Sequence, residues 1–171
     1  PQAIAAGDFH CGFVNVAGAL LTCGVEDSHY VVREYPGILG HGEGVTRLAV
    51  PTPVPSLQRV RIRSVSAGIF HTLAVSDSGA AISFGRNEYG QLGHGEAGDA
   101  VHVPKQIEAL RSVAVHAVSA GYFHSLLLAA SGAAVSRGAV PLGRLRDAQA
   151  AGWPRDGHSA MAGSARAVLA W

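Results

Sequence analysis

Three histidines recur in one local context and are the first candidates for chemistry in this sequence. His10, His71 and His124 each follow a phenylalanine and each precede a glycine by eight residues. Imidazole is a frequent metal ligand and an acid–base group near neutral pH. Side chains that recur at one position of a repeat lie on separate structural units, however, so we do not expect these three to converge on one metal ion. We expect each ring to be half-buried and hydrogen-bonded to backbone.

Other stretches resemble sites of chemistry but lack a required residue. His41 and His94 lie in two LGHG segments and are more exposed candidates, yet a lone imidazole is a weak metal site. The segment GHSAMAG has Met161 where a nucleophile elbow needs glycine two residues after its serine. No glycine-rich loop ends in the lysine of a phosphate-binding motif. We therefore predict no enzyme activity, no bound metal and no cofactor.

Composition narrows the class of protein. The 171 residues are 48% apolar and 15% charged, which is enough apolar material for one globular domain. The net charge of +1 does not provide the basic stripe typical of direct nucleic-acid binding. No apolar run is long enough to span a membrane, and the first residues do not resemble a signal peptide. We expect an intracellular protein, cytoplasmic or nuclear, whose partners are proteins.

The chain has two cysteines, Cys11 and Cys23, which are too few for a disulfide scaffold. They flank one predicted hairpin, so a bridge between its two strands is geometrically feasible. Two half-buried free thiols are the alternative, because free cysteine packs as a small apolar residue. The sequence leaves both states open.

An internal repeat positions the histidines. Glycines lie three residues before, eight after and fourteen after each of them. The steps between the histidines are 61 and 53 residues, and the extra eight belong to an insertion within residues 25–36. The residues expected to maintain the fold in every repeat are Gly7, His10, Gly18, Gly24, Gly68, His71, Gly79, Gly85, Gly121, His124, Gly132 and Gly138.

Each repeat has the pattern of short strands. In the second repeat, HTLAVS and AAISF flank a short Asp-Ser-Gly loop whose glycine can adopt a positive φ. We therefore predict an antiparallel hairpin within each of the segments 7–24, 68–85 and 121–138. A repeat of about 50 residues that holds about four short strands is typical of a propeller blade.

The segment AGIFHTLAVSDSGAAISFGRNEYGQLGHG resembles the signature repeat of the regulator of chromosome condensation (RCC1-like) family. The resemblance implies an all-β fold of RCC1-like β-propeller blades, with about seven blades in a closed ring. The chain, a single repeat region over residues 1–171, holds about three of them, so the remaining blades are expected from the same or another chain. Repeat 1 covers about 1–52, repeat 2 about 53–105 and a degenerate repeat 3 about 106–150, and residues 151–171 resemble the start of a fourth.

Departures from the repeat are where we expect partner binding, because fold-maintaining residues recur in every blade. Tyrosine and arginine are enriched at interface hot spots. Three alternating arginines on one face of a predicted strand form a ladder that is interpreted either as a solvated strand protected against edge pairing or as a site for an acidic protein surface. The candidates are Tyr30, Arg33 and Tyr35 in the insertion, and Arg59, Arg61 and Arg63 in QRVRIRS.

The predicted function is a non-catalytic propeller segment that mediates protein–protein interaction, as a scaffold or a subunit of a larger assembly. The resemblance offers two alternatives. One is a guanine-nucleotide exchange factor for a small GTPase, the activity of the family's founding member, and the other is a propeller-type enzyme inhibitor. The plant ultraviolet photoreceptors that share this fold depend on tryptophan clusters, and this chain has only Trp153 and Trp171, which argues against that role.

Overall fold

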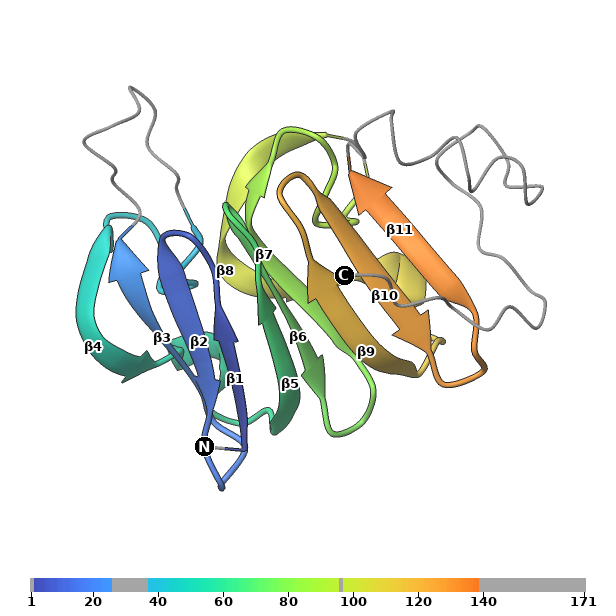
Figure 1. Ribbon diagram of the computed structural model, residues 1–171, viewed down its shortest axis with the longest axis horizontal. Helices are drawn as coiled ribbons and strands as arrows, with labels where there is room; N and C mark the ends of the chain where they lie inside the picture. The colour runs from blue at the N-terminus through green and yellow to red at the C-terminus, as the bar shows by residue number, and fades with distance from the viewer. Residues whose placement is uncertain (1, 26–36, 96, 139–171) are drawn as a thin grey trace.

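The computed structural model describes residues 2–25, 37–95 and 97–138, which form three antiparallel sheets side by side (Figure 1). These residues contain no α-helix, and the predicted all-β class is confirmed. Two short 3₁₀ turns, η1 (Pro55–Leu57) and η2 (Glu108–Leu110), lead from one sheet to the next. Within the described part of the chain, no helix is long and apolar enough to cross a membrane.

Each sheet is a meander, in which strands that are consecutive in sequence are neighbours in space. The first sheet contains β1 (Ala3–Ala6), β2 (His10–Val14), β3 (Leu20–Val25) and β4 (Arg47–Pro53). The second contains β5 (Ile62–Ala67), β6 (His71–Ser76), β7 (Ala81–Asn87) and β8 (Gly98–Gln106). The third contains β9 (Val115–Ala120), β10 (His124–Ala129) and β11 (Ala134–Gly138).

The three predicted hairpins are confirmed, and they share one register. The turn glycine of the middle hairpin, Gly79, has φ +85°, a left-handed conformation that other residues adopt only with strain. In every hairpin the recurrent histidine lies opposite the glycine that follows it by fourteen residues: His10 pairs with Gly24, His71 with Gly85 and His124 with Gly138.

Two apolar clusters hold the sheets together. The cluster between the first and second sheets includes Val14 on β2 and Phe84 on β7, both fully buried. The cluster between the second and third sheets includes Val75 on β6 and Val115 on β9. Full burial of such a side chain contributes roughly 1.5–3 kcal/mol. Packing of one sheet face on the next is therefore the main source of cohesion.

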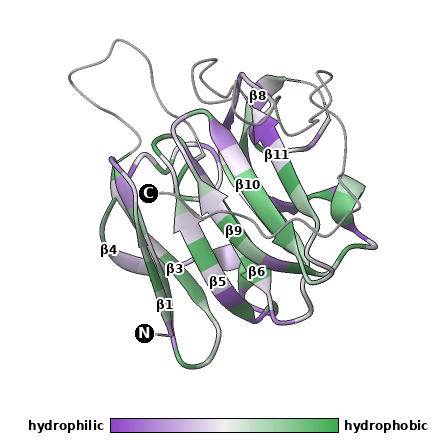
Figure 2. Ribbon diagram, turned by 45° about the vertical axis from the view of Figure 1, so that its right-hand side comes forward, coloured by the Kyte–Doolittle hydropathy of each residue, from purple (hydrophilic) through white to green (hydrophobic). Residues whose placement is uncertain are grey.

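The sheets at the two ends of the row each have a face that no other described sheet covers. On β10 of the third sheet Leu126 is 48% exposed, whereas its equivalent in the second sheet, Leu73, is fully buried. On β1 of the first sheet Ile4 is 69% exposed. Figure 2 shows the apolar residues along β10. Exposed apolar faces of this kind mark surfaces that associate with other protein.

The recurrent glycine before each histidine allows adjacent sheets to approach closely. A methyl group on Gly68 would lie 2.6 Å from the carbonyl oxygen of Gly121 in the third sheet and 2.8 Å from Cε1 of His71. Gly7 faces the carbonyl oxygen of Gly68 in the same way. Real Cβ atoms essentially never approach other atoms this closely, so only glycine lets the turns of neighbouring sheets meet here.

We predict that Gly68→Ala destabilises the protein by roughly 1–3 kcal/mol, the usual cost of forcing an extra carbon into a packed site. Gly98→Ala is the matched control, because nothing lies within 4 Å of the added carbon and the φ angle there is not left-handed. Urea denaturation of both variants measures the difference in free energy of unfolding. Equal stability of the two variants would contradict the prediction.

Candidate functional site

A chain of hydrogen bonds joins the first sheet to the second through a buried histidine. His10 Nε2 lies 2.6 Å from the hydroxyl of Thr72, which donates to the carbonyl oxygen of Ile38 at 2.9 Å. The hydroxyl has one proton, so its oxygen must accept a hydrogen bond from a protonated Nε2. The geometry therefore assigns His10 the tautomer with its proton on Nε2. Thr72 connects the second sheet to a strand and a loop of the first.

The second and third sheets repeat this arrangement. His71 Nε2 lies 2.9 Å from the hydroxyl of Ser125, which donates to the carbonyl oxygen of Gln91 at 2.7 Å. Each hydroxyl residue directly follows a recurrent histidine in the sequence. The expectation that these rings bond to backbone is wrong for His10 and His71. Their direct partner is a side-chain hydroxyl of the next sheet, and it is this hydroxyl that bonds the backbone.

In each LGHG loop, the carbonyl oxygen of the leucine accepts a hydrogen bond from a second hydroxyl group, which belongs to the same sheet as the loop. Thr22 on β3 donates to the carbonyl oxygen of Leu39 at 2.7 Å, and His41 Nε2 lies 3.1 Å from the same hydroxyl. Ser83 on β7 does the same in the second sheet, where His94 is its imidazole partner at 3.0 Å. His41 and His94 are therefore partly buried and hydrogen-bonded, not the exposed side chains that the sequence suggested.

Burial keeps the interior histidines neutral. Desolvation lowers the pKa of His10 to about 4, and it also lowers the pKa of His71 to about 4, with a smaller contribution from His10 and His124. Nδ1 of both rings is buried and has no hydrogen-bond partner in the described part of the chain. A proton on Nδ1 would have neither water nor an acceptor. A neutral ring in a fixed tautomer suits a structural role better than proton transfer.

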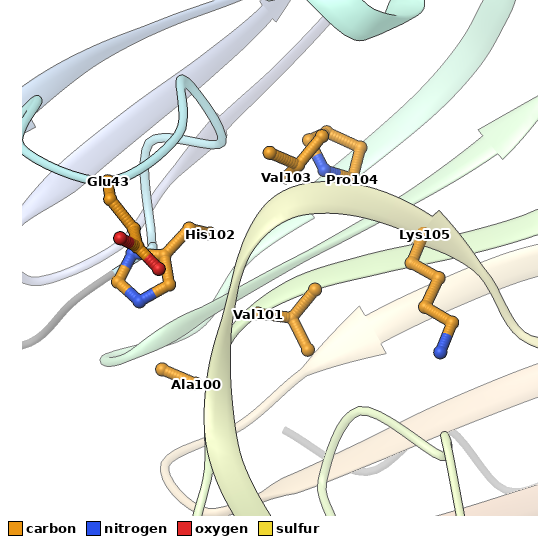
Figure 3. Close-up of a pocket in the computed structure, with 7 residues that line it drawn as sticks. All are labelled: Glu43, Ala100, Val101, His102, Val103, Pro104 and Lys105. Carbon is orange, nitrogen blue, oxygen red and sulfur yellow. The ribbon is translucent and has the colours of Figure 1, made fainter.

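A shallow pocket runs along β8, but its charged groups do not converge. Figure 3 shows Glu43 and His102 on one side of the β8 ribbon and Lys105 on the other, so the pocket presents no paired acid and base. The remaining lining is mostly apolar, with Val101, Val103 and Pro104. Among residues 2–25, 37–95 and 97–138, no three metal-ligating side chains come together.

The predicted arginine ladder does not exist as one face of a strand. The turn η1 and the residues after it occupy the start of the segment, so Arg59 lies in a turn, Arg61 precedes β5, and only Arg63 belongs to the strand. Arg63 Nη2 donates to the carbonyl oxygens of Val115 and His116 in the third sheet, at 2.5 and 3.3 Å. This guanidinium therefore connects the second sheet to the third.

The other sequence candidates are either exposed or lie outside the described residues. Arg59 is exposed, and Arg61 Nε donates to Asp77 Oδ2 at 2.9 Å, with the two side chains 63% and 47% exposed. An ion pair this exposed contributes at most about 1 kcal/mol. The insertion candidates Tyr30, Arg33 and Tyr35 lie outside the described residues.

An aromatic row that the sequence analysis did not identify crosses the three sheets. Phe9, Phe70 and Phe123 lie in the turns that precede β2, β6 and β10, at the upper edge in Figure 1. The rings of Phe9 and Phe70 stack with centroids 5.8 Å apart, and those of Phe70 and Phe123 with centroids 6.1 Å apart. Phe70 is 5% exposed and packs with Ile38 and Leu39 of the first sheet. The row is a rigid base for the rings beside it.

Two tyrosines and an arginine extend this row to the surface. The ring centroids of Tyr122 and Tyr89 lie 4.2 and 4.7 Å from that of Phe123, and these tyrosines are 51% and 44% exposed. The Arg86 guanidinium lies 5.1–5.8 Å from the ring centroids of Phe70, Tyr89 and Phe123, and Nη2 donates to the Glu88 carboxylate. We name as the aromatic face the residues Phe9, Phe70, Arg86, Tyr89, Tyr122 and Phe123.

One signal in the sequence points to this face. Tyr122 occupies the position that Ile69 has in the second repeat, so it is a departure from the repeat directly beside the recurrent phenylalanine. Tyr89 has no such signal, because it lies in a segment dominated by glycines with turn roles. The side-by-side placement of the three turns, which the structure supplies, is needed to bring the rings together.

Three meander sheets, joined in order by hydroxyl groups that follow a recurrent histidine, define a repeat protein of the β-propeller class, with one blade per sheet. Residues 34–75 and 78–128 match the family model described as the regulator of chromosome condensation (RCC1) repeat, and residues 62–91 match a second model of that repeat. The chain belongs to the RCC1 repeat family, as the sequence motif indicated.

The relatives are longer proteins. The ultraviolet-B receptor UVR8 of Arabidopsis thaliana is 38% identical over 96 residues, which cover 56% of this chain and 21% of the receptor. Human WBSCR16 has a TM-score of 0.67 at 24% identity, over 79% of this chain and 32% of that one. Yeast RCC1 (Prp20), solved bound to Kap60, has a TM-score of 0.64 at 28% identity, over 79% and 31%. This chain thus spans about a third or less of each.

We predict that His71→Ala lowers the free energy of unfolding by about 1–3 kcal/mol, because it opens a small cavity and leaves Ser125 without its imidazole donor. The exposed His116→Ala should change stability by less than about 0.5 kcal/mol and serves as the control. A double-mutant cycle with Ser125→Ala tests the contact itself. Purely additive effects of the two substitutions would show that the hydrogen bond contributes nothing.

The free energy of unfolding should decrease as the pH is lowered from 6.5 toward 4, because the interior histidines are neutral in the folded state. Their pKa is about 4 in the folded state and near the ordinary 6.5 when unfolded, so the unfolded chain binds protons more readily. Their contribution is complete above pH 6.5 and is lost as the pH falls toward 4. Denaturation in urea across this range measures the slope, which His71→Gln should reduce. A slope that His71→Gln leaves unchanged would assign the proton uptake to other groups.

Proposed function

We propose that this chain is part of a non-catalytic RCC1-type propeller that binds another protein through its aromatic face, as a scaffold or a subunit of a larger assembly. The observation that carries the proposal is the exposure of Tyr89 and Tyr122 beside a stacked row of phenylalanines whose middle member, Phe70, is buried. Soluble proteins seldom leave clustered aromatic rings exposed without a binding role.

The composition of this face favours a protein partner. Tyrosine and arginine are over-represented among residues that dominate binding energy, especially where their surroundings are already packed. Tyr122 and Tyr89 both contact Phe123, so these rings lose little conformational freedom when a partner covers them. Arg86 is only 12% exposed and is oriented by Glu88, so it supports the rings from beneath. The expected partner surface is apolar at its centre with a polar rim.

The relatives support binding of protein as a general role. Yeast RCC1 was solved in complex with Kap60, so that member of the family binds another protein. Its chain is about three times as long as the matched part, and further blades beside the third sheet would extend the surface on which the aromatic face lies. The identity of its partner is not carried over to this chain.

The sequence candidates define a separate proposed contact. Arg61 is bonded to Asp77 in the turn between β6 and β7, which is the end of the second sheet opposite to Phe70. Arg59 and Arg61 therefore do not extend the aromatic face, and an acidic partner bound there would be a second partner. The insertion residues Tyr30, Arg33 and Tyr35 are retained as candidates for partner contact on their residue types alone.

The test is to replace the two exposed rings in the full-length protein. Tyr89→Ala with Tyr122→Ala should weaken binding of a partner captured from the source cell at least about tenfold, as expected for central aromatic contacts. The dissociation constant is measured with purified partner by calorimetry. Thermal unfolding of the double variant confirms that the folded state persists.

The matched control is Val50→Ala on β4, which removes an exposed apolar side chain away from the aromatic face. It should leave the dissociation constant unchanged. If the folded double variant keeps every partner at wild-type affinity, recognition by the aromatic face is excluded. Loss of binding with Arg59→Glu and Arg61→Glu instead would move the site to the opposite end of the sheet.

A further inference from the structure

The residue between the recurrent glycine and the recurrent phenylalanine differs in each repeat. It is Asp8 in the first, Ile69 in the second and Tyr122 in the third, although glycine, phenylalanine and histidine recur around it. The three hairpins share one register, so these residues occupy equivalent positions in their turns. We name Asp8, Ile69 and Tyr122 the variable row. A row of turn residues that changes while its surroundings recur is suited to recognising the side chains of a partner.

The variable row lies against the stacked phenylalanines. The ring of Tyr122 meets those of Phe70 and Phe123 edge-on, with centroids 5.8 and 4.2 Å apart. Ile69 packs against the apolar cluster that contains Phe70. The second sheet has the first sheet on one side and the third on the other, and Ile69 is still partly exposed. The accessibility of this position therefore does not depend on a sheet that lacks a neighbour.

The spacing of the turns fits an extended peptide. The ring centroids of Phe9, Phe70 and Phe123 are 5.8 and 6.1 Å apart, and the variable row follows the same three turns, which lie side by side in Figure 1. Alternate residues of an extended chain lie on one face, about 6.4–6.8 Å apart. A helix takes even steps of about 6 Å only with residues four apart, and each step turns the side chain by about 40°, away from a straight row. The three positions therefore match alternate residues of an extended segment.

Charge sets the order of the side chains in that segment. The Arg86 guanidinium lies 5.1–5.8 Å from the ring centroids of Phe70, Tyr89 and Phe123, so a cation already occupies these rings. At the other end of the row, Asp8 is exposed and enters no ion pair with another described residue. A basic side chain of the partner is therefore attracted to the Asp8 end of the row.

We propose that the partner of the aromatic face supplies an extended peptide segment with three specified side chains at alternate positions. A basic side chain lies over Asp8, an aliphatic one against Ile69, and an aromatic or proline ring against Tyr122, where ring contacts are favoured. The inference rests on the proposed function, because Tyr122 belongs to both the aromatic face and the variable row. It adds the class of ligand and the order of its side chains.

Selection of short randomised peptides displayed on phage, against the immobilised full-length protein, tests the pattern. We expect enrichment of a basic, an aliphatic and a ring-bearing residue at alternate positions, in either chain direction. Apolar residues enriched three and four positions apart would indicate a helical ligand and overturn the proposal. Enrichment of acidic residues, or of no pattern, would also overturn it.

A charge swap tests the contact with Asp8. Asp8→Lys should weaken binding of the selected peptide about fivefold, as measured by fluorescence anisotropy. A peptide with glutamate in place of its basic residue should bind this variant more tightly than it binds the wild type. The control Glu108→Lys makes the same change of charge on an exposed side chain of η2, at the end of the third sheet opposite to Tyr122, and should have no effect.

The equivalent positions hold isoleucine and tyrosine, so the turn should accept lysine at position 8, and thermal unfolding checks that it does. Asp8→Ile, which copies the second repeat, is the second variant and should also weaken binding of the basic peptide. If Tyr89→Ala with Tyr122→Ala abolishes partner binding but neither substitution of Asp8 alters it, the aromatic face binds protein and the extended register is wrong. If none of these variants changes binding, both proposals are wrong.

Discussion

The arrangement of the sheets depends on hydrogen bonding of two consecutive backbone carbonyl groups at the start of each LGHG loop. They belong to the leucine of the motif and to the residue directly before it. Ile38 and Leu39 are fully buried, and a buried carbonyl without a donor costs about 1–3 kcal/mol. Leu39 receives its hydrogen bond from the same sheet, through Thr22, but Ile38 receives it from Thr72 of the next sheet. A sheet therefore satisfies its own loop only when its neighbour is docked. The histidine that orients Thr72 and the glycines that let the turns meet all serve this one requirement.

The same geometry places the residues that we assign to recognition. Each phenylalanine of the aromatic face lies directly before a recurrent histidine, so the contacts that fix the histidines also fix the rings. Stacking of three rings along the sheets would be lost if the sheets were displaced by a few ångströms. The fold-maintaining residues and the binding surface are thus adjacent along the sequence but point in different directions. The repeat supplies a rigid support, and single substitutions such as Tyr122 supply what a partner contacts.

The repeat spacing and turn glycines were sufficient to predict the all-β class and the three hairpins, because register and turns are local properties of the sequence. The family was predicted from the resemblance of the second repeat to a known motif. The spacing was not sufficient for contacts between sheets. The histidines were expected to bond to backbone, since the sequence does not show that Thr72 and Ser125 lie beside the histidines of the preceding sheet. The arginine ladder failed because the 3₁₀ turn before β5 interrupts the alternation that a longer strand would give. The aromatic face combines residues from the turns of all three sheets with Arg86 of β7 and Tyr89 of the loop that follows, which no single segment reveals.

Because each loop depends on the following sheet, the sheets should be completed one after another, in chain order, during synthesis. During synthesis the strands of the first sheet are complete once Pro53 has been made, but the donor for Ile38 is Thr72, nineteen residues further along the chain. A ribosome adds roughly 5–20 residues per second, so the emerging sheet remains unfinished for seconds at most before its successor closes it. Maturation then moves from the amino end to the carboxyl end, and at every moment only the newest sheet is incomplete. A nascent chain of this kind therefore moves its one unfinished loop forward with each sheet, however many repeats the finished protein contains.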